Sequence, residues 1–495
     1  MERVAAAVVL CRGTGSGREV YLAHRAPQLR FFGDYLAMPG GVRGAEDGPD
    51  DPDGGDSTAL RNCAVRELFE ETGVLLDPGM RGVAASRRSG LREAMLGDDK
   101  EAATRAWAEL RELADDRIAL REVCRIRTPP FAPVRYDTVF FLAQLPEGEE
   151  PEIWPGELID GGFQSAEAAL DLWIRGEQRV VPPVIVLLQR LRNDNVDRFV
   201  AEAASMAEGF RRGKLHRIWF SPGILLAPLE TQTLPPATTT NCYIVGTDRL
   251  FVIDPGTPDE AEQRRLFDLL DELQAEGSTV DSVVCTHHHP DHVGAVGAVS
   301  QRYDVPVRGH PVTMERLDQD IQGVVLVSDG DRIELGRAPD GTEDWHLTAI
   351  FTPGHDRGHL AFRESRYGAL IAGDMISTLA TIMIDPPEGH MQTYLDSLHR
   401  LTKDEITTLY PAHGPAMPNG VALVEHAIKH RKQRQAALET ALAKGPNTIE
   451  GLLPIVYWDV KEDMYPYASR SMLAGLQMMQ EAGCATSDGD TWRPV

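Results

Sequence analysis

Four histidines and one aspartate crowd into the segment "THHHPDHVG", which follows an apolar, strand-like run. Imidazole and carboxylate groups at this density are typical of sites for a borderline-soft divalent metal. A purely structural role would leave several buried rings in need of partners at once. Two such groups of ligands would make a two-metal site, whose natural chemistry is hydrolysis. The residues concerned are His287, His288, His289, Asp291 and His292.

Three later segments end strand-like runs at polar turns: "TPGHDRGH" supplies His355, "IAGDMI" supplies Asp374 and "YPAHG" supplies His413. Their order, after an H-x-H-x-D-H spacing, resembles the metallo-β-lactamase fold superfamily. The resemblance implies an αββα sandwich that holds two zinc or other divalent transition metal ions. It implies one metal group of His287, His289 and His355, a second of Asp291, His292 and His413, and Asp374 as the bridge.

Two divalent ions that share a water make it ionise near neutral pH and polarise a carbonyl or phosphoryl oxygen. We therefore expect hydroxide attack on a thioester, an ester or a phosphodiester. Asp291 is the catalytic candidate of this segment, because it could also orient the nucleophile or accept a proton. The metal ligands define the reaction better than the substrate.

The neighbouring polar residues need separate interpretation. His288 points away from its neighbours if the tripeptide is extended, which favours a structural role over ligation. His359 could line the pocket, and a hydrogen-bonded structural role is an equal alternative. Asp254 in "VIDPG" matches a carboxylate of the superfamily that supports the ligand loop without binding metal.

Within the superfamily, "TNCYIVG", "VIDPGTPDE", "DPPEGHMQTYLDSLHRL" and "HRKQRQ" resemble the β-lactamase-like protein 2 group. Its members carry a helical, winged-helix-like tail after the last ligand, and the group includes single-strand RNA endonucleases. The stretch "HAIKHRKQRQ" is the most basic of the chain, and His430, Arg431, Lys432 and Arg434 fall together on an expected helix. They could hold an RNA or CoA phosphate. A solvated helix face is the favoured interpretation.

A second acidic motif stands far upstream, in "NCAVRELFEETGVLL". Glu67, Glu70 and Glu71 are spaced so that one face of a helix presents three carboxylates, which repel one another unless a cation neutralises them. Asp56 or Ser57 is a plausible helix N-cap, and Gly73 ends the helix. By spacing alone, an exposed acidic helix and a metal site are equal alternatives.

The run R-E-L-F-E-E-T-G-V resembles the second half of the Nudix hydrolase box. The resemblance implies an α/β/α sandwich that holds Mg²⁺ or Mn²⁺ and cleaves a nucleoside diphosphate joined to another group. It implies Glu70 and Glu71 as metal ligands, Glu67 as the catalytic base or a ligand, and Arg66 as the residue that orients the glutamates. Oxygen ligands suit such a hard cation.

The first half of this box departs from the family pattern. Thr58 occupies the place of a glutamate, and a Gly- and Asp-rich insert lengthens the interval between Gly41 and Arg66 to 25 positions. The segment "TPPFAPVRYDTVFFLAQLPEGEEP" is similar to the Nudix branch that includes the peroxisomal CoA diphosphatase, which also has a long insertion there. Glu157 is a candidate for an extra carboxylate from outside the box, or a surface loop acid.

The 495 residues exceed one ordinary core, so we expect several domains. We divide the chain into a Nudix-like domain (1–205), a metallo-β-lactamase-like domain (206–420) and a helical, winged-helix-like tail (421–495). The expected fold class is multidomain α/β and α+β. A formal charge of −25 disfavours a general nucleic-acid binder, although it leaves room for a local basic groove. Scattered cysteines without CxxC spacing and no membrane-spanning run favour a cytoplasmic protein.

The sequence leaves three hypotheses open. In the favoured one, both modules are hydrolases of small molecules, with acyl-CoA or a nucleotide conjugate as a possible common substrate class. The alternative is a single-strand RNA endonuclease with a nucleotide-sensing Nudix-like domain. In the third, the Nudix-like domain binds nucleotide and regulates without catalysis. The oligomeric state is open.

Overall fold

The computed structural model describes residues 2–29, 32–49, 58–114, 120–154, 156–192 and 195–495. The chain forms two compact units, Met1–Pro222 and Gly223–Val495. The candidate helix caps Asp56 and Ser57 lie outside the described residues. The three-domain division stays a prediction. Among the helices that the structure describes, none is long and apolar enough to cross a membrane.

The first unit is built on one mixed sheet with the strand order β3–β2–β1–β6–β5, and β4 and β7 pair with β1 and β2. Strands β1 and β6 are parallel. The strands of this sheet are β1 (Glu2–Arg12), β2 (Glu19–Arg25), β3 (Leu36–Ala37), β4 (Gly40–Val42), β5 (Arg121–Arg127), β6 (Arg135–Gln144) and β7 (Leu158–Gln164). Strand β8 (Ile218–Ser221) lies outside this sheet.

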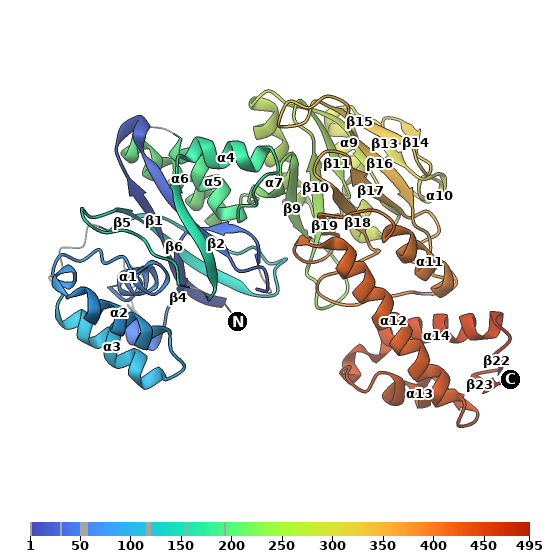
Figure 1. Ribbon diagram of the computed structural model, residues 1–495. Helices are drawn as coiled ribbons and strands as arrows, with labels where there is room; N and C mark the ends of the chain where they lie inside the picture. Colours follow the sequence, from blue (N-terminus) through green and yellow to red (C-terminus); the bar gives the residue numbers. More distant parts are fainter. Residues whose placement is uncertain (1, 30–31, 50–57, 115–119, 155, 193–194) are drawn as a thin grey trace. The chain divides into compact units, whose positions relative to one another are not determined.

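Helices cover both faces of this sheet (Figure 1). The cause is visible in β1, where Ala6 and Val8 join the core beneath one helical layer, while Ala7 and Val9 join the core of the other. A strand that is buried on both faces reads as a continuous apolar run. One layer holds α1 (Thr58–Thr72), α2 (Ala85–Leu96) and α3 (Lys100–Glu112), and the other α4 (Ala166–Ile174), α5 (Pro182–Leu191) and α6 (Val196–Arg211). The expected α/β/α sandwich is confirmed.

The second unit contains two sheets. The first has the order β14–β13–β12–β11–β10–β9 and the second β15–β16–β17–β18–β19–β20. Tyr243 of β10 and Tyr410 of β19 meet edge to face, with ring centroids 5.4 Å apart, so the sheets face each other. The first sheet comprises β9 (Ile224–Glu230), β10 (Thr239–Val245), β11 (Arg249–Ile253), β12 (Thr279–Val284), β13 (Val307–Gly309) and β14 (Val324–Leu326). The second comprises β15 (Arg332–Gly336), β16 (Trp345–Phe351), β17 (Leu360–Glu364), β18 (Ala369–Gly373), β19 (Thr408–Pro411) and β20 (Met417–Pro418).

Helices flank both sheets of this unit, which confirms the αββα arrangement. Leu398 of α11 and Val424 of α12 share a buried cluster with Leu370 of the second sheet. Helices α7 and α9 contact β12 of the first sheet. The helices are α7 (Glu260–Ala275), α8 (Pro290–Val293), α9 (Val296–Tyr303), α10 (Pro311–Glu315), α11 (Met391–Leu401) and α12 (Gly420–Leu442).

The long helix α12 continues from the second sheet into a C-terminal tail (Figure 1). The tail has its own core, in which Leu442, Leu452 and Trp492 are buried together. Its small sheet has the order β21–β23–β22. This is the expected helical, winged-helix-like tail. Its further elements are β21 (Asn447–Thr448), α13 (Ile449–Val456), α14 (Tyr465–Glu481), β22 (Ala485–Asp488) and β23 (Thr491–Pro494).

Candidate metal centre and acidic helix

The predicted ligands of the second unit all follow the carboxyl end of a strand, where loops commonly carry binding residues. Strand β12 ends at Val284, just before the histidine-rich segment. His355 follows β16, Asp374 follows β18 and His413 follows β19. Segments far apart in the chain therefore deliver their polar side chains to one place.

The first ligand group comes together as the sequence predicts. His287, His289, His355 and Asp374 offer ligand atoms that lie within 4.8 Å of one another. His289 Nδ1 lies 3.0 Å from His287 Nε2 and 3.0 Å from His355 Nε2. Three ring nitrogens at this separation can direct their lone pairs at one cation.

The second group consists of Asp291, His292 and His413, whose ligand atoms also lie within 4.8 Å of one another. Asp374 lies between the groups. Its Oδ1 is 3.3 Å from His413 Nε2 and 3.6 Å from His292 Nε2. Its Oδ2 is 3.5 Å from His355 Nε2 in the first group. This is the position that a bridging carboxylate requires.

The residues present fit divalent metal ions. His292 Nδ1 is 2.8 Å from Asp254, His355 Nδ1 is 2.9 Å from the carbonyl of Met383, and His413 Nδ1 is 3.1 Å from that of Thr239. When Nδ1 donates to such an acceptor, Nε2 is left as a lone pair for metal. Among the described residues, His292 Nε2 and Asp374 Oδ1 are buried without a hydrogen-bond partner. A bound cation would satisfy both atoms.

Asp254 lies behind both groups and connects them. Its carboxylate accepts hydrogen bonds from His292 Nδ1 and, at 2.8 and 2.6 Å, from the backbone N and Oγ1 of Thr286. Thr286 Oγ1 is in turn 3.0 Å from His287 Nδ1. Asp254 itself has a φ of 51°, a strained conformation for a residue with a side chain. One carboxylate thus orients a histidine of each group.

The surroundings lower the pKa of some of these histidines and raise the pKa of others. Burial lowers the pKa of His287 well below its ordinary value, and burial together with His355 lowers that of His289 to about 4. Burial opposes protonation of His292 and His413 as well, but the carboxylates around them, Asp374 first among them, together outweigh it and raise the pKa of both. Rings without a proton on the ligating nitrogen are the form that binds metal.

His359 and His288 stand outside the two groups. His359 Nδ1 lies 2.8 Å from Thr352 Oγ1, and its Nε2 accepts the backbone N–H of Asp374 at 3.1 Å. A Cβ at Gly373, whose φ is +50°, would lie 2.5 Å from this ring. His359 therefore supports the loop that carries Asp374, which is the structural one of its two expected roles. His288 Nδ1 pairs with buried Asp356 at 2.6 Å, and the two form a further possible ligand group with His289.

A cavity of about 580 Å³ opens over these ligands. Its walls include residues of the loop before β10, such as Leu234 and Pro235. The opposite wall comes from α12 and the tail, including His430, Arg431 and Tyr467. The solvated-face interpretation of the basic stretch is wrong for Arg431, because only 6% of this residue is exposed. The ring of Tyr394, on α11, and the carbonyl of Ile382 contact its guanidinium, and the sequence does not reveal these partners.

The tail also fixes the loop between β18 and α11. Arg431 donates to the carbonyl of Ile382, Ser471 Oγ accepts the backbone N–H of Ile384 at 3.1 Å, and Arg470 donates to the carbonyl of Pro386 at 2.8 Å. His355 is held by the next carbonyl, that of Met383. Helices α12 and α14 therefore fix the loop that holds a predicted metal ligand.

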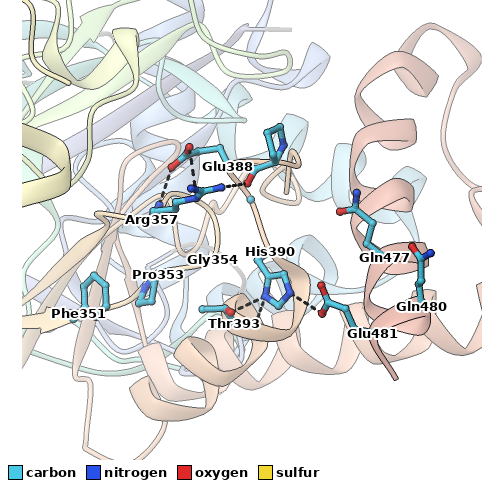
Figure 2. Close-up of a pocket in the computed structure, with 12 residues that line it drawn as sticks. Phe351, Pro353, Gly354, Arg357, Glu388, His390, Thr393, Gln477, Gln480 and Glu481 are labelled. Atoms are coloured by element: carbon cyan, nitrogen blue, oxygen red, sulfur yellow. Dashed lines mark hydrogen bonds and ion pairs between the residues drawn. The ribbon is translucent and has the colours of Figure 1, made fainter. Parts of the chain in front are cut away.

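A second pocket, of about 760 Å³, lies where this loop meets α11 and α14 (Figure 2). Figure 2 shows Arg357 reaching toward Glu388 and His390 lying between Thr393 and Glu481. His390 Nε2 is 2.9 Å from Glu481, and its Nδ1 is 2.6 Å from Thr393 Oγ1. These polar groups pair with one another, and His390 thereby joins the start of α11 to the end of α14.

Residues 235–413 match the metallo-beta-lactamase superfamily. This stretch is a metallo-β-lactamase domain. The atrochrysone carboxyl ACP thioesterase of Passalora fulva is 29% identical over 208 residues, which cover 41% of this chain and 57% of that protein. The β-lactamase-like protein 2 homolog of Drosophila melanogaster is 25% identical over 49% of this chain and 83% of that protein. These likenesses confirm the expected hydrolase, and the fold implies divalent metal; zinc and the individual ligand roles stay predictions.

The N-terminal part has a structural likeness of its own. The crystal structure of a NUDIX hydrolase from Alicyclobacillus acidocaldarius aligns with 41% of this chain and 96% of that chain, at 31% identity and a TM-score of 0.34. This TM-score is low, so the contacts of the first unit's own residues decide what its acidic motif can do.

The acidic motif of the first unit lies on α1, with Arg66 at its centre. Arg66 Nη1 lies 3.0 Å from Glu67 and 2.9 Å from Glu70. Glu71 accepts the backbone N–H of Gly40 at 2.8 Å. Within the part of the chain that the structure describes, these glutamates do not gather within 4.8 Å as the histidine groups do. Arg66 is placed to orient two of them, and their metal roles stay predictions.

Sequence reasoning missed the main partner of Arg66. Asp47, fully buried at the start of the insert, receives Arg66 Nε at 2.8 Å and Nη2 at 2.9 Å. It also accepts the backbone N–H of Gly44 at 2.8 Å, which fixes the short turn Ala45–Asp47. Thr58, in the place of the missing acid, is exposed at the start of α1. The insert itself thus supplies a carboxylate for Arg66.

Arg92 of α2 is a second residue that the motif does not reveal. It is buried and donates to the carbonyls of Glu70 at 3.0 Å, Glu71 at 2.8 Å and Glu152 at 2.8 Å. These carbonyls include two at the end of α1 that have no partner within the helix. Arg92 therefore fixes the helical turn that carries two candidate ligands.

Burial raises the pKa of the three glutamates of α1 above the ordinary value. It raises the pKa of Glu70 and of Glu71 to about 8, and it raises that of Glu67. The charge of Glu157, an exposed residue before β7, adds to the rise at Glu67 and Glu71. Carboxylates that are hard to ionise without a cation are suited to bind one. Glu157 is therefore near enough to act on the cluster, and its ligation stays a prediction.

We expect Asp254→Asn to weaken metal binding by about 10- to 100-fold, because an amide cannot accept from both Thr286 and His292 as the carboxylate does. Metal retained after dialysis against graded chelator measures the change. Asp281→Asn is the control, because Asp281 lies on β12 and pairs with Arg249 of β11, the strand that ends just before Asp254. Equal metal retention in both variants would contradict the role of Asp254.

We expect Asp47→Asn to lower the unfolding free energy of the first unit by about 1–3 kcal/mol, because buried Arg66 loses one of its ionic partners. Hydrogen exchange of α1 amides across a urea titration measures this. Glu46→Gln is the control, because Glu46 lies 3.9 Å from Arg66 and its side chain is 35% exposed. Its effect should stay within about 0.5 kcal/mol, and an equal effect of both changes would refute the assignment.

Proposed function

We propose that the second unit hydrolyses a thioester with two divalent transition metal ions, held by the six ligands of the two groups and bridged by Asp374. The observation that carries this proposal is the place of Asp374, whose two oxygens face different histidine groups. When bound, the ions would make a water ionise near neutral pH and would polarise the substrate's carbonyl oxygen. Hydrogen bonds to Asp254, Thr286 and main-chain carbonyls keep the lone pairs of the histidine rings directed at the centre.

Asp291 is the proton acceptor in this proposal. It is half-buried and lines the cavity, and its Oδ2 lies 3.5 Å from Thr240 Oγ1 and 3.6 Å from His413 Nε2. A carboxylate at the edge of the cavity can take a proton from the attacking water and pass it to the leaving thiol. The loop Gln232–Ala237 and residues of α12 and the tail line the same cavity.

The choice of a thioester over other esters is supported by one relative and by charge. The Passalora fulva relative is named as a thioesterase of an acyl carrier protein. A chain with a net charge of −25 lacks the general attraction for phosphate backbones that a nucleic-acid enzyme uses. An acyl thioester of CoA or of a similar carrier therefore fits better than RNA.

For the first unit we propose a Nudix-type site that cleaves a nucleoside diphosphate conjugate, such as CoA or a derivative, with Mg²⁺ or Mn²⁺. Glu70 and Glu71 would bind the ion, and Glu67 would act as base or ligand. Support comes from the helical spacing of these residues and from Asp47, which supplies the acid that the motif lacks at Thr58. Both units would then act on related small molecules.

Two variants separate the activities of the full chain. We expect Asp291→Asn to reduce acyl-CoA thioester hydrolysis by about 100-fold or more and to leave release of 3′,5′-ADP from CoA intact, and Glu70→Gln to do the reverse. Paired rate measurements on the same preparations test this. Hydrolysis of neither substrate by the metal-loaded wild type would refute the proposal. Cleavage of single-stranded RNA that His287→Ala abolishes would favour the endonuclease instead.

A further inference from the structure

The cavity over the metal groups is lined by a buried arginine whose charge is not paired with an acid in the part of the chain that the structure describes. Arg431, on α12, lines this cavity and is 6% exposed. Within the described residues, it takes part in no ion pair at 4.0 Å or less. Its contacts are the carbonyl of Ile382 and the ring of Tyr394, whose centroid lies 5.3 Å from the guanidinium carbon. These neutral groups position the guanidinium but do not cancel its charge.

The neighbouring arginine shows the contrast. Arg434, one helical turn along α12, also lines the cavity, but Asp459 meets it with both oxygens at 2.9 and 3.1 Å. The tail therefore supplies a counter-ion for one arginine and leaves the other without one. A buried charge without a partner is costly, and the cost falls when an anionic ligand binds.

Arg431 is also coupled to the metal centre through the loop. It binds the carbonyl of Ile382, and the predicted ligand His355 binds the adjacent carbonyl of Met383. A guanidinium has five N–H donors and can bind a carboxylate or a phosphate through two of them. An anion bound there would lie in the same cavity as the scissile bond.

We propose that Arg431 is an anion-binding residue of the substrate cavity, and that it holds a carboxylate or phosphate oxygen carried by the thioester substrate. The thioester part of this statement rests on the function proposed above. The oxyanion has two possible sources: a carboxylate on the acyl part or the phosphate of a pantetheine carrier arm. The sequence leaves two interpretations of this basic stretch, phosphate binding and a solvated face, and the burial of Arg431 favours the first for this residue.

Binding of non-hydrolysable thioethers to the metal-loaded full chain tests the proposal. One pair of probes shares an N-acetylcysteamine thioether body and ends in a carboxylate or the matching carboxamide. The other pair is S-methyl pantetheine with and without its 4′-phosphate. We expect the wild type to bind the charged member of one pair at least about tenfold more tightly, and that pair identifies the source of the oxyanion.

Arg431→Gln removes the charge but keeps a donor for the Ile382 carbonyl, so the preference should disappear while metal content is unchanged. Arg431→Lys should retain part of it. Arg470→Met is the matched control, because Arg470 holds the same loop through Asp385 and Pro386 without lining the cavity. This variant should keep the full preference. Arg431→Met is a second neutral variant should the Gln variant fold poorly.

A wild type without preference in either pair would overturn the proposal, and so would a preference that survives in the neutral variants. Thioester hydrolysis measured on the same preparations separates this inference from the proposed function. A charge preference that depends on Arg431, without any hydrolysis, would refute the thioesterase and retain the anion site.

Discussion

The convergence of buried histidine nitrogens on Asp374 is the constraint around which the second unit is arranged. Each ligand loop enters from the end of a different strand, and the ring nitrogens approach to 3.0 Å. Such an arrangement is unfavourable without a cation, because the lone pairs face one another and Asp374 Oδ1 has no hydrogen-bond partner among the described residues. Hydrogen bonds that the rings donate to Asp254 and to main-chain carbonyls hold them in this arrangement. The fold thus provides the orientation, and metal ions would provide the attraction.

In the first unit, an arginine side chain offsets the repulsion among crowded carboxylates. There a single buried guanidinium, that of Arg66, interacts with Glu67, Glu70 and Asp47. Arg92 holds the end of the same helix by its carbonyls. This acidic site therefore carries part of its own compensating charge, and the ion pairs of Arg66 offset part of the repulsion among its carboxylates.

Local patterns explain what the sequence could predict. The ligands of the second unit lie in short motifs at strand ends, so their residue types and order are visible without a fold. The two-faced burial of β1 and the three carboxylates on α1 are likewise periodic features of contiguous residues. Domain boundaries are less visible, and residue 205 of the expected boundary lies inside α6, whose Phe199 and Ala203 are buried in the first unit.

The contacts that the sequence could not reveal join residues far apart in the chain. Asp47 looks like one more acid of a polar insert until the fold brings it to Arg66, and Arg431 looks solvated until the fold brings it against Tyr394 and the carbonyl of Ile382. His359 was open between two roles until its contact with the Asp374 backbone favoured one. In each case the side chain's partner is a backbone group or a residue of another element, which no local spacing encodes.

Electron paramagnetic resonance of the Mn²⁺-loaded chain tests whether the second unit holds two adjacent ions joined by Asp374. The substitutions Glu70→Gln and Glu71→Gln are present in the background to weaken metal binding in the first unit. We expect the spectrum of an exchange-coupled pair of ions, because Asp374 lies between two adjacent ligand groups. The variant Asp374→Ala should abolish this coupling. Spectra of isolated ions only, at saturating metal, would contradict it.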